Sequence, residues 1–185
     1  MGTVLLLVVA TSAVAQSKQP VDISGVTATG VVSGNRYTNS FFKLTVDAHN
    51  ATLQSNPVVS ATGQRARLVQ VQAEPTNWED TYTFAVLADS LSGYPQLQSS
   101  AQYVRSVRHQ LEKEGLPTVR EEFPVAIAGV QFTGAIVQEH VPAGRKYYRG
   151  IYATFRKGYV LSFDAEAATE NKLNELVTRM VTFTK

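Results

Sequence analysis

The sequence predicts an α+β domain with a mainly antiparallel β-sheet, on which a central helix and a C-terminal helix pack. Apolar residues recur at every second position in much of the chain, which is typical of strands with one buried face. Helical spacing occurs in only two long segments, and these do not alternate strictly with the strands as βαβ units require. The 185 residues show no internal repeat and no evident linker, so we expect one domain.

The first fifteen residues differ in composition from the rest and are predicted to be a signal peptide. An aliphatic run over residues 4–9 is followed by Ala13-Val14-Ala15, which is the small–x–small pattern of a signal-peptidase site. The usual basic residues ahead of the run are missing, and a buried first strand or helix is the alternative. Because the run is shorter than the roughly 20 residues that span a membrane, we expect an exported protein, periplasmic or secreted. No stable membrane insertion is expected after cleavage.

A flexible N-terminal segment is expected over residues 16–30, which are rich in Ser, Thr, Gly and Gln. The single α+β domain then covers residues 31–185. It begins with a predicted β-hairpin, because Gly34-Asn35 tolerates positive φ and lies between apolar and aromatic segments. Residues 47–64 have weak periodicity and are expected to be irregular or to contain a short helix.

Period-two alternation predicts the other strands. Val69, Val71 and Ala73, for example, share one face of a predicted strand. In a later strand, Glu121 and Pro124 indicate a position at the edge of the sheet. Strands are expected over residues 41–46, 66–73, 82–87, 119–127, 130–139, 147–155 and 159–163, with turns at residues 142–144 and 157–158.

Two helices are predicted from apolar residues three or four positions apart. The first covers residues 99–114, with Ser99 or Ser100 as its N-cap. Gly115 suits the left-handed conformation that ends a helix, so that Leu116 folds back on Leu111. The second helix begins near Thr169 and buries Leu173, Leu176, Val177 and Met180.

The residue types exclude several kinds of chemistry. The chain has no cysteine, which rules out disulfides, thiolate nucleophiles, iron–sulfur clusters and Cys-ligated zinc. The three histidines, His49, His109 and His140, lie in no catalytic or metal-binding motif and are expected at the surface. No nucleophile elbow, calcium loop or phosphate loop is present. We therefore expect no cofactor, no metal and no enzymatic activity.

Two further readings of the charged residues are weighed. Asp164 and Glu166 share a face of a predicted strand and could form the acid–base pair of a hydrolase, but the solvated face of a strand is the favoured interpretation. The net charge of +2 is small and dispersed, so no nucleic-acid partner is expected. Arg65 and Arg67 could join other arginines in a patch for an anionic ligand if the fold brings them together.

A partner-binding surface is the functional hypothesis that the residues leave open. Trp78, the only tryptophan, lies in a polar connection and is expected either to bind a partner or to close over the core. Arg145, Tyr147 and Arg149 share one face of a predicted strand and combine the cations and aromatic rings that are frequent in interfaces. These four residues are the candidate binding residues.

The order of elements resembles the Mog1/PsbP-like fold. The resemblance rests on the aromatic hairpin at residues 34–39, on residues 148–159 and on the amphipathic C-terminal helix. Residues 47–64 lack the proline-glycine-tryptophan segment that usually follows the aromatic strand in that family. The resemblance implies an exported, non-enzymatic binding or assembly domain with a protein partner or small ligand in the cell envelope. A carrier of a small ligand is the alternative, and a hydrolase is the third.

Overall fold

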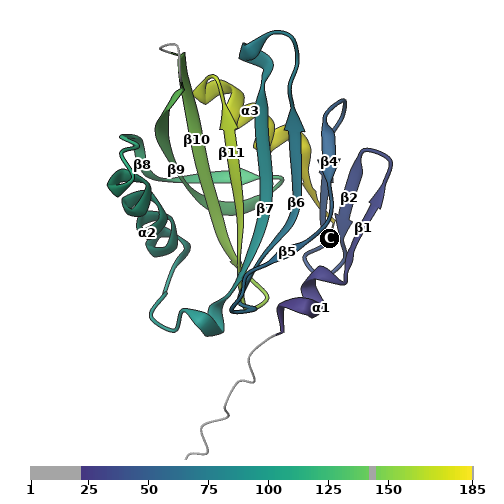
Figure 1. The fold of residues 1–185 in the computed structure, drawn as a ribbon. Helices are drawn as coiled ribbons and strands as arrows, with labels where there is room; N and C mark the ends of the chain where they lie inside the picture. Colours follow the sequence, from purple (N-terminus) through teal and green to yellow (C-terminus); the bar gives the residue numbers. More distant parts are fainter. Residues whose placement is uncertain (1–21, 142–144, 185) are drawn as a thin grey trace, which may run out of the picture.

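A computed structural model describes residues 22–141 and 145–184, in which strands predominate (Figure 1). The strands are β1 (Gly30–Ser33), β2 (Arg36–Asn39), β3 (Leu44–Asp47), β4 (Thr52–Gln54), β5 (Val58–Val59), β6 (Arg65–Ala73), β7 (Tyr82–Ser90), β8 (Thr118–Ile127), β9 (Val130–Val141), β10 (Arg145–Arg156), β11 (Tyr159–Ala167) and β12 (Val181–Phe183). The helices are α1 (Ile23–Thr27), α2 (Ser100–Lys113) and α3 (Glu170–Met180), with 3₁₀ turns η1 (Trp78–Asp80) and η2 (Leu91–Gly93). The predicted α+β class is confirmed.

Two antiparallel sheets organise the described residues. The larger follows the order β4-β6-β7-β11-β10-β9-β8, with β5 also paired to β6, and the smaller follows β1-β2-β3-β12. Helix α3 lies behind the larger sheet in Figure 1, and the main core lies between this sheet, α3 and the smaller sheet. Helix α2 packs on the opposite face, mainly over β8, β9 and β10, and its Tyr103 also reaches Asp89 of β7.

The predicted turns and caps are confirmed where local chemistry specifies them. Gly34 has a φ of 57° in the β1–β2 hairpin. The Ser99 side chain accepts a hydrogen bond from the Gln102 N–H at the start of α2. At its end Gly115 has a φ of 92°, and the Leu116 N–H donates to the Leu111 carbonyl at 3.0 Å. Strand β8 lies at the edge of the larger sheet, as its proline predicted.

Tertiary contacts override the local pattern in three places. Part of the segment expected to be flexible forms α1, which Asp22 caps by accepting from the Ser24 N–H while Ile23 and Val26 are buried. Residues 47–64 contain the short strands β4 and β5, where an irregular segment or a helix was expected. Strand β12 follows α3 without a break and pairs with β3.

Strand β6 also differs from the simple alternation. Its register with β7 shifts between Arg67 and Val69, so the neighbours Leu68 and Val69 are both buried. The predicted signal peptide at residues 1–15, residues 16–21 and the predicted turn at 142–144 lie outside the described residues. In the part of the chain that is described, no helix has both the length and the apolar character needed to cross a membrane.

Candidate functional site

Three of the four candidate binding residues come together at one end of the larger sheet. The ring centroids of Trp78 and Tyr147 are 6.1 Å apart, and the Arg145 guanidinium carbon lies 5.2 Å from the Trp78 ring centroid. The Tyr147 hydroxyl donates a hydrogen bond to the Trp78 carbonyl oxygen at 3.2 Å. We call these three residues the Trp78 patch. It joins η1, in the connection between β6 and β7, to the start of β10.

The Trp78 side chain rests on this strand and remains partly accessible. Trp78 belongs to none of the buried core clusters of the described residues and is only half-buried, so it does not close over the core. Asn77 fixes the turn beneath it by accepting from the Glu79 N–H at 3.3 Å. A shallow hollow of about 430 Å³ adjoins the ring, and it is lined by Trp78, Lys146, Tyr148, Ala168, Thr169, Glu170 and Asn171. A half-exposed tryptophan therefore stands beside a concave surface.

Arg149, the fourth candidate, lies in an ion cluster instead. Its guanidinium forms two hydrogen bonds with Asp164, at 2.9 and 2.6 Å, and a third with Glu139 at 3.4 Å. Arg65 pairs with Asp89. Asp89 lies opposite Val160 of β11, six residues before Glu166, which lies opposite Arg149. Because Arg65 and Arg149 are each neutralised by local carboxylates, they do not form the shared patch for an anionic ligand that was considered.

Asp164 and Glu166 share a face of β11, as expected. That face is half-buried rather than freely solvated, and both carboxylates accept hydrogen bonds from neighbouring strands. Thr83 donates a hydrogen bond to Glu166 at 3.1 Å. Burial, reinforced by the nearby Glu139 carboxylate, raises the pKa of Glu166. The three pockets described for this structure are lined by other residues.

The histidines give this carboxylate pair no support. His109 is exposed on α2, where its Nδ1 lies 2.8 Å from a Glu112 oxygen. His49 follows β3 and lies beside Asp47. The side chain of His140 is outside the described part of the structure. In the described residues, no group of three or more His, Asp or Glu side chains is arranged to hold a metal ion.

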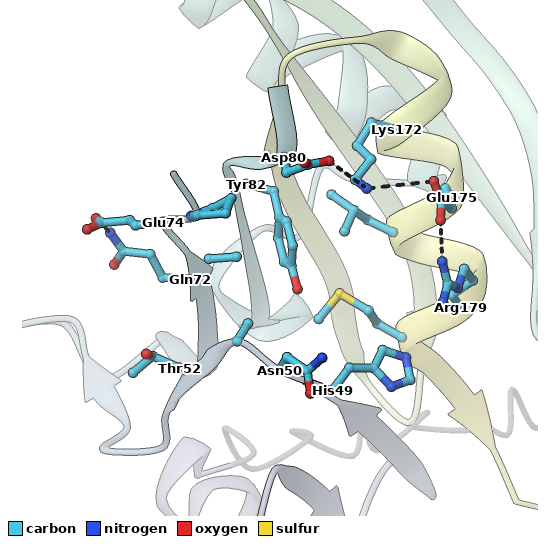
Figure 2. A pocket seen from close by; sticks show the side chains of 15 residues that line it. His49, Asn50, Thr52, Gln72, Glu74, Asp80, Tyr82, Lys172, Glu175 and Arg179 are labelled. Atoms are coloured by element: carbon cyan, nitrogen blue, oxygen red, sulfur yellow. Dashed lines mark hydrogen bonds and ion pairs between the residues drawn. The ribbon is translucent and has the colours of Figure 1, made fainter. Parts of the chain in front are cut away.

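A larger pocket, of about 530 Å³, lies between α3, the β3–β4 turn and the ends of β6 and β7. Figure 2 shows the Tyr82 hydroxyl pointing into it. Its lining includes the apolar residues Ala51, Ala73, Leu176 and Met180 beside polar and charged side chains. Such a mixed apolar and polar lining is typical of sites for small organic molecules.

One wall of this pocket is a row of alternating charges (Figure 2). The Lys172 Nζ lies 4.0 Å from an Asp80 oxygen and 3.9 Å from a Glu175 oxygen, and Glu175 also pairs with Arg179. The Arg179 hydrogen bond lowers the pKa of Glu175, while burial raises the pKa of Tyr82. Sequence reasoning did not identify this pocket. The spacing of Lys172, Glu175 and Arg179 on the polar flank of the C-terminal helix was the only signal.

The solved structures that are similar to this chain share little of its sequence. The chain is similar to cyanobacterial PsbP from Synechocystis sp. PCC 6803, with 11% identity and a TM-score of 0.49 over 84% of this chain and 96% of that one. It is also similar to LpqN of Mycobacterium tuberculosis, described as involved in cell envelope biogenesis, with 10% identity and a TM-score of 0.41 over 74% and 87% of the two chains. A protein from Bacteroides thetaiotaomicron gives 14% identity and 0.41 over 83% and 50%.

No protein-family model and no curated protein matches the sequence. At these identities the likeness concerns the fold alone and transfers no functional residue. Cyanobacterial PsbP, whose fold the order of elements resembles, is among these similar structures.

Proposed function

We propose that this protein is an exported, non-catalytic binding module that assembles with a protein partner through the Trp78 patch. The observation that carries the proposal is the position of Trp78, half-buried and held between Tyr147 and Arg145 at the end of a sheet. Trp, Tyr and Arg are enriched among the few residues that supply most of the binding energy in protein interfaces. Because the Tyr147 ring and the Arg145 guanidinium already contact the Trp78 ring, less side-chain entropy is lost when a partner covers it.

The non-catalytic part of the proposal rests on how the charged groups are used. The carboxylates that could have formed an acid–base pair, Asp164 and Glu166, are engaged by Arg149 and Thr83. A general acid or base needs a free path to a substrate proton. Turnover of a hydrolase substrate panel that is lost in Asp164→Asn would contradict this part of the proposal.

Export is proposed from the signal-peptide pattern of residues 1–15. The mature chain is then expected to begin at Gln16 and to be found outside the cytoplasm. Mass spectrometry of the protein purified from its native source measures the N-terminus directly. A chain that retains residues 1–15 in the cytoplasmic fraction would refute export and leave the Trp78 patch untouched.

The binding experiment compares capture of partners from a native envelope extract by the wild type and by Trp78→Ala. Arg145→Ala tests the cation, and Arg120→Ala is its matched control, because Arg120 also lies over an aromatic ring, 3.8 Å from the Phe123 centroid. We expect the wild type and Arg120→Ala to retain the same partner. Trp78→Ala should bind it about thirtyfold more weakly or worse, since hot-spot tryptophans contribute about 2 kcal/mol or more. Equal capture by all four proteins would rule out the patch.

A second candidate function is supported by the pocket beside α3. Its volume of about 530 Å³ and its mixed apolar and polar lining would suit a small organic ligand, as in a carrier protein. Native mass spectrometry of the protein from its source would show a bound molecule that is lost in Tyr82→Ala. An empty protein in that experiment, together with intact partner binding, would favour the binding module over the carrier.

A further inference from the structure

Strand β1 is an unprotected sheet edge, unlike the other edges of the described sheets. Strand β8 carries the charges Arg120 and Glu121, Pro124 and two register irregularities, all of which hinder pairing with another strand. Strands β4, β5 and β12 have only two or three residues each. Strand β1 pairs with β2 without irregularity and contains neither a charge nor a proline.

Its side chains are also unusually apolar for a surface. Val31 is 61% exposed and Val32 is 39% exposed, which places both among the few large apolar side chains at the surface. Figure 1 shows the β1–β2 hairpin projecting at the margin of the molecule. In the described ranges, no strand other than β2 pairs with β1.

The hydrogen-bonding register fixes which backbone groups face outward. The Thr29 carbonyl accepts from the Ser40 N–H at 3.2 Å, so residue 29 faces the β2 side. Backbone groups alternate in direction along an antiparallel strand, and residues 31 and 33 therefore also face β2. The N–H and C=O groups of Gly30 and Val32 point toward the free edge, where they can bind another strand.

We propose that β1 pairs in antiparallel fashion with β1 of a second copy of this chain. Directly opposed residues of two antiparallel strands lie on the same face of the sheet. A twofold axis perpendicular to the sheet meets this condition only if it passes midway between one residue and the same residue of the second copy. With the axis at Val31, Gly30 lies opposite Val32 of the second copy, and the reverse. Both of these pairs have outward-facing groups, so they exchange four backbone hydrogen bonds in total. The two small sheets become one continuous sheet.

A second copy fits this edge because the edge is self-complementary. Val31 meets its own equivalent, which a charged residue at this position would forbid through like-charge repulsion. Gly30, opposite Val32, must stay small because a Cβ there would lie 2.6 Å from the Tyr37 hydroxyl oxygen. The strand has only four residues, and an interface of this size is expected to be weak and concentration-dependent.

Disulfide trapping tests this register in a chain that has no cysteine of its own. In the proposed dimer the two Val31 residues form a non-hydrogen-bonded pair with Cα atoms about 4.5 Å apart, which is within disulfide range. Val31→Cys should therefore form a covalent homodimer under mild oxidation at least tenfold faster than Val58→Cys. Val58 is the matched control because it is 53% exposed on β5.

Sedimentation equilibrium provides an independent readout. The wild type and Val58→Lys should show a concentration-dependent dimer, and Val31→Lys should remain monomeric. Equal crosslinking rates for the two cysteine variants would overturn the proposal, as would a wild type that stays monomeric at every concentration. A Val31→Cys adduct with a different protein, in place of the homodimer, would also overturn it. Trp78→Ala should leave dimerisation unchanged, so this proposal and the proposed function can fail separately.

Discussion

Removing the hydroxyl of Tyr103 should destabilise the fold through a buried carboxylate. Asp89 on β7 is fully buried, and its carboxylate accepts hydrogen bonds from Arg65 Nε at 2.5 Å and from the Tyr103 hydroxyl at 2.9 Å. Burial raises the pKa of Tyr103, and the Asp89 charge raises it further, so the hydroxyl remains a donor well into the alkaline range. Tyr103 is the side chain of α2 that ties this helix to the buried charge.

The magnitude follows from the charge of the acceptor. A hydrogen bond to a charged group stabilises by about 1.5–3 kcal/mol, and Tyr103→Phe leaves the Oδ2 atom of Asp89 without its donor. For a domain of this size each kcal/mol shifts Tm by roughly 2–4 °C, so a decrease of about 3–12 °C is expected. Urea unfolding followed by the fluorescence of Trp78, the sole tryptophan, measures the free energy of unfolding.

Tyr94→Phe is the matched control for this substitution. The Tyr94 hydroxyl lies 3.5 Å from the Asp89 Oδ1 atom, a distance at which a hydrogen bond is weak. We expect this variant to lose less than about 0.5 kcal/mol. A Tyr103→Phe variant as stable as Tyr94→Phe would refute the reasoning, since it would mean that the buried charge does not depend on α2.

Three further predictions concern single positions. Glu166→Gln should be more stable than the wild type at neutral pH, because the raised folded-state pKa of Glu166 makes the wild type lose stability as pH rises through that pKa. In unfolding curves measured across pH, the difference in stability between the two proteins should vanish below about pH 4, under the unfolded-state pKa of the carboxyl group. Gly134→Ala should cost about 1–3 kcal/mol in chemical denaturation, because a Cβ would lie 2.8 Å from Phe123 and 3.0 Å from Tyr152. Gly115→Ala should cost about 1 kcal/mol in thermal unfolding, since its φ of 92° favours glycine; no loss in either glycine variant would contradict the corresponding argument.

The predictable parts of the fold are those with a local physical cause. The end of α2 was predicted because Gly115 and Pro117 leave few other conformations for the chain. The edge position of β8 followed from Pro124, which cannot donate a ladder hydrogen bond. Alternation located most of the long strands, including β7, where Phe84, Val86 and Ala88 are buried and the residues between them are half-buried.

The remaining parts are determined by contacts distant in sequence. Strand β12 continues directly from α3, and nothing local distinguishes Val181 from another helical residue; its pairing with Val46 of β3 does. Strands β4 and β5 are too short to show a period. The shift in β6 that buries both Leu68 and Val69 depends on its pairing with β7.

The candidate site divides in the same way. Trp78 and Tyr147 were chosen separately by residue type, and the fold brings them together through β10. Arg149 was chosen on the same grounds, but its position opposite Asp164 on β11 engages it in an ion pair. The pocket beside α3 draws its walls from four segments and left no contiguous pattern in the sequence.

Photocrosslinking from position 146 tests most directly whether the Trp78 patch binds a partner, because Lys146 is exposed and lines the hollow beside Trp78. A benzophenone-bearing phenylalanine is placed at position 146 and, as the control, at position 120, and each protein is irradiated in its native compartment. We predict one covalent adduct of defined mass from position 146 and none of that mass from position 120. No adduct from position 146, or the same adduct from both positions, would contradict the account.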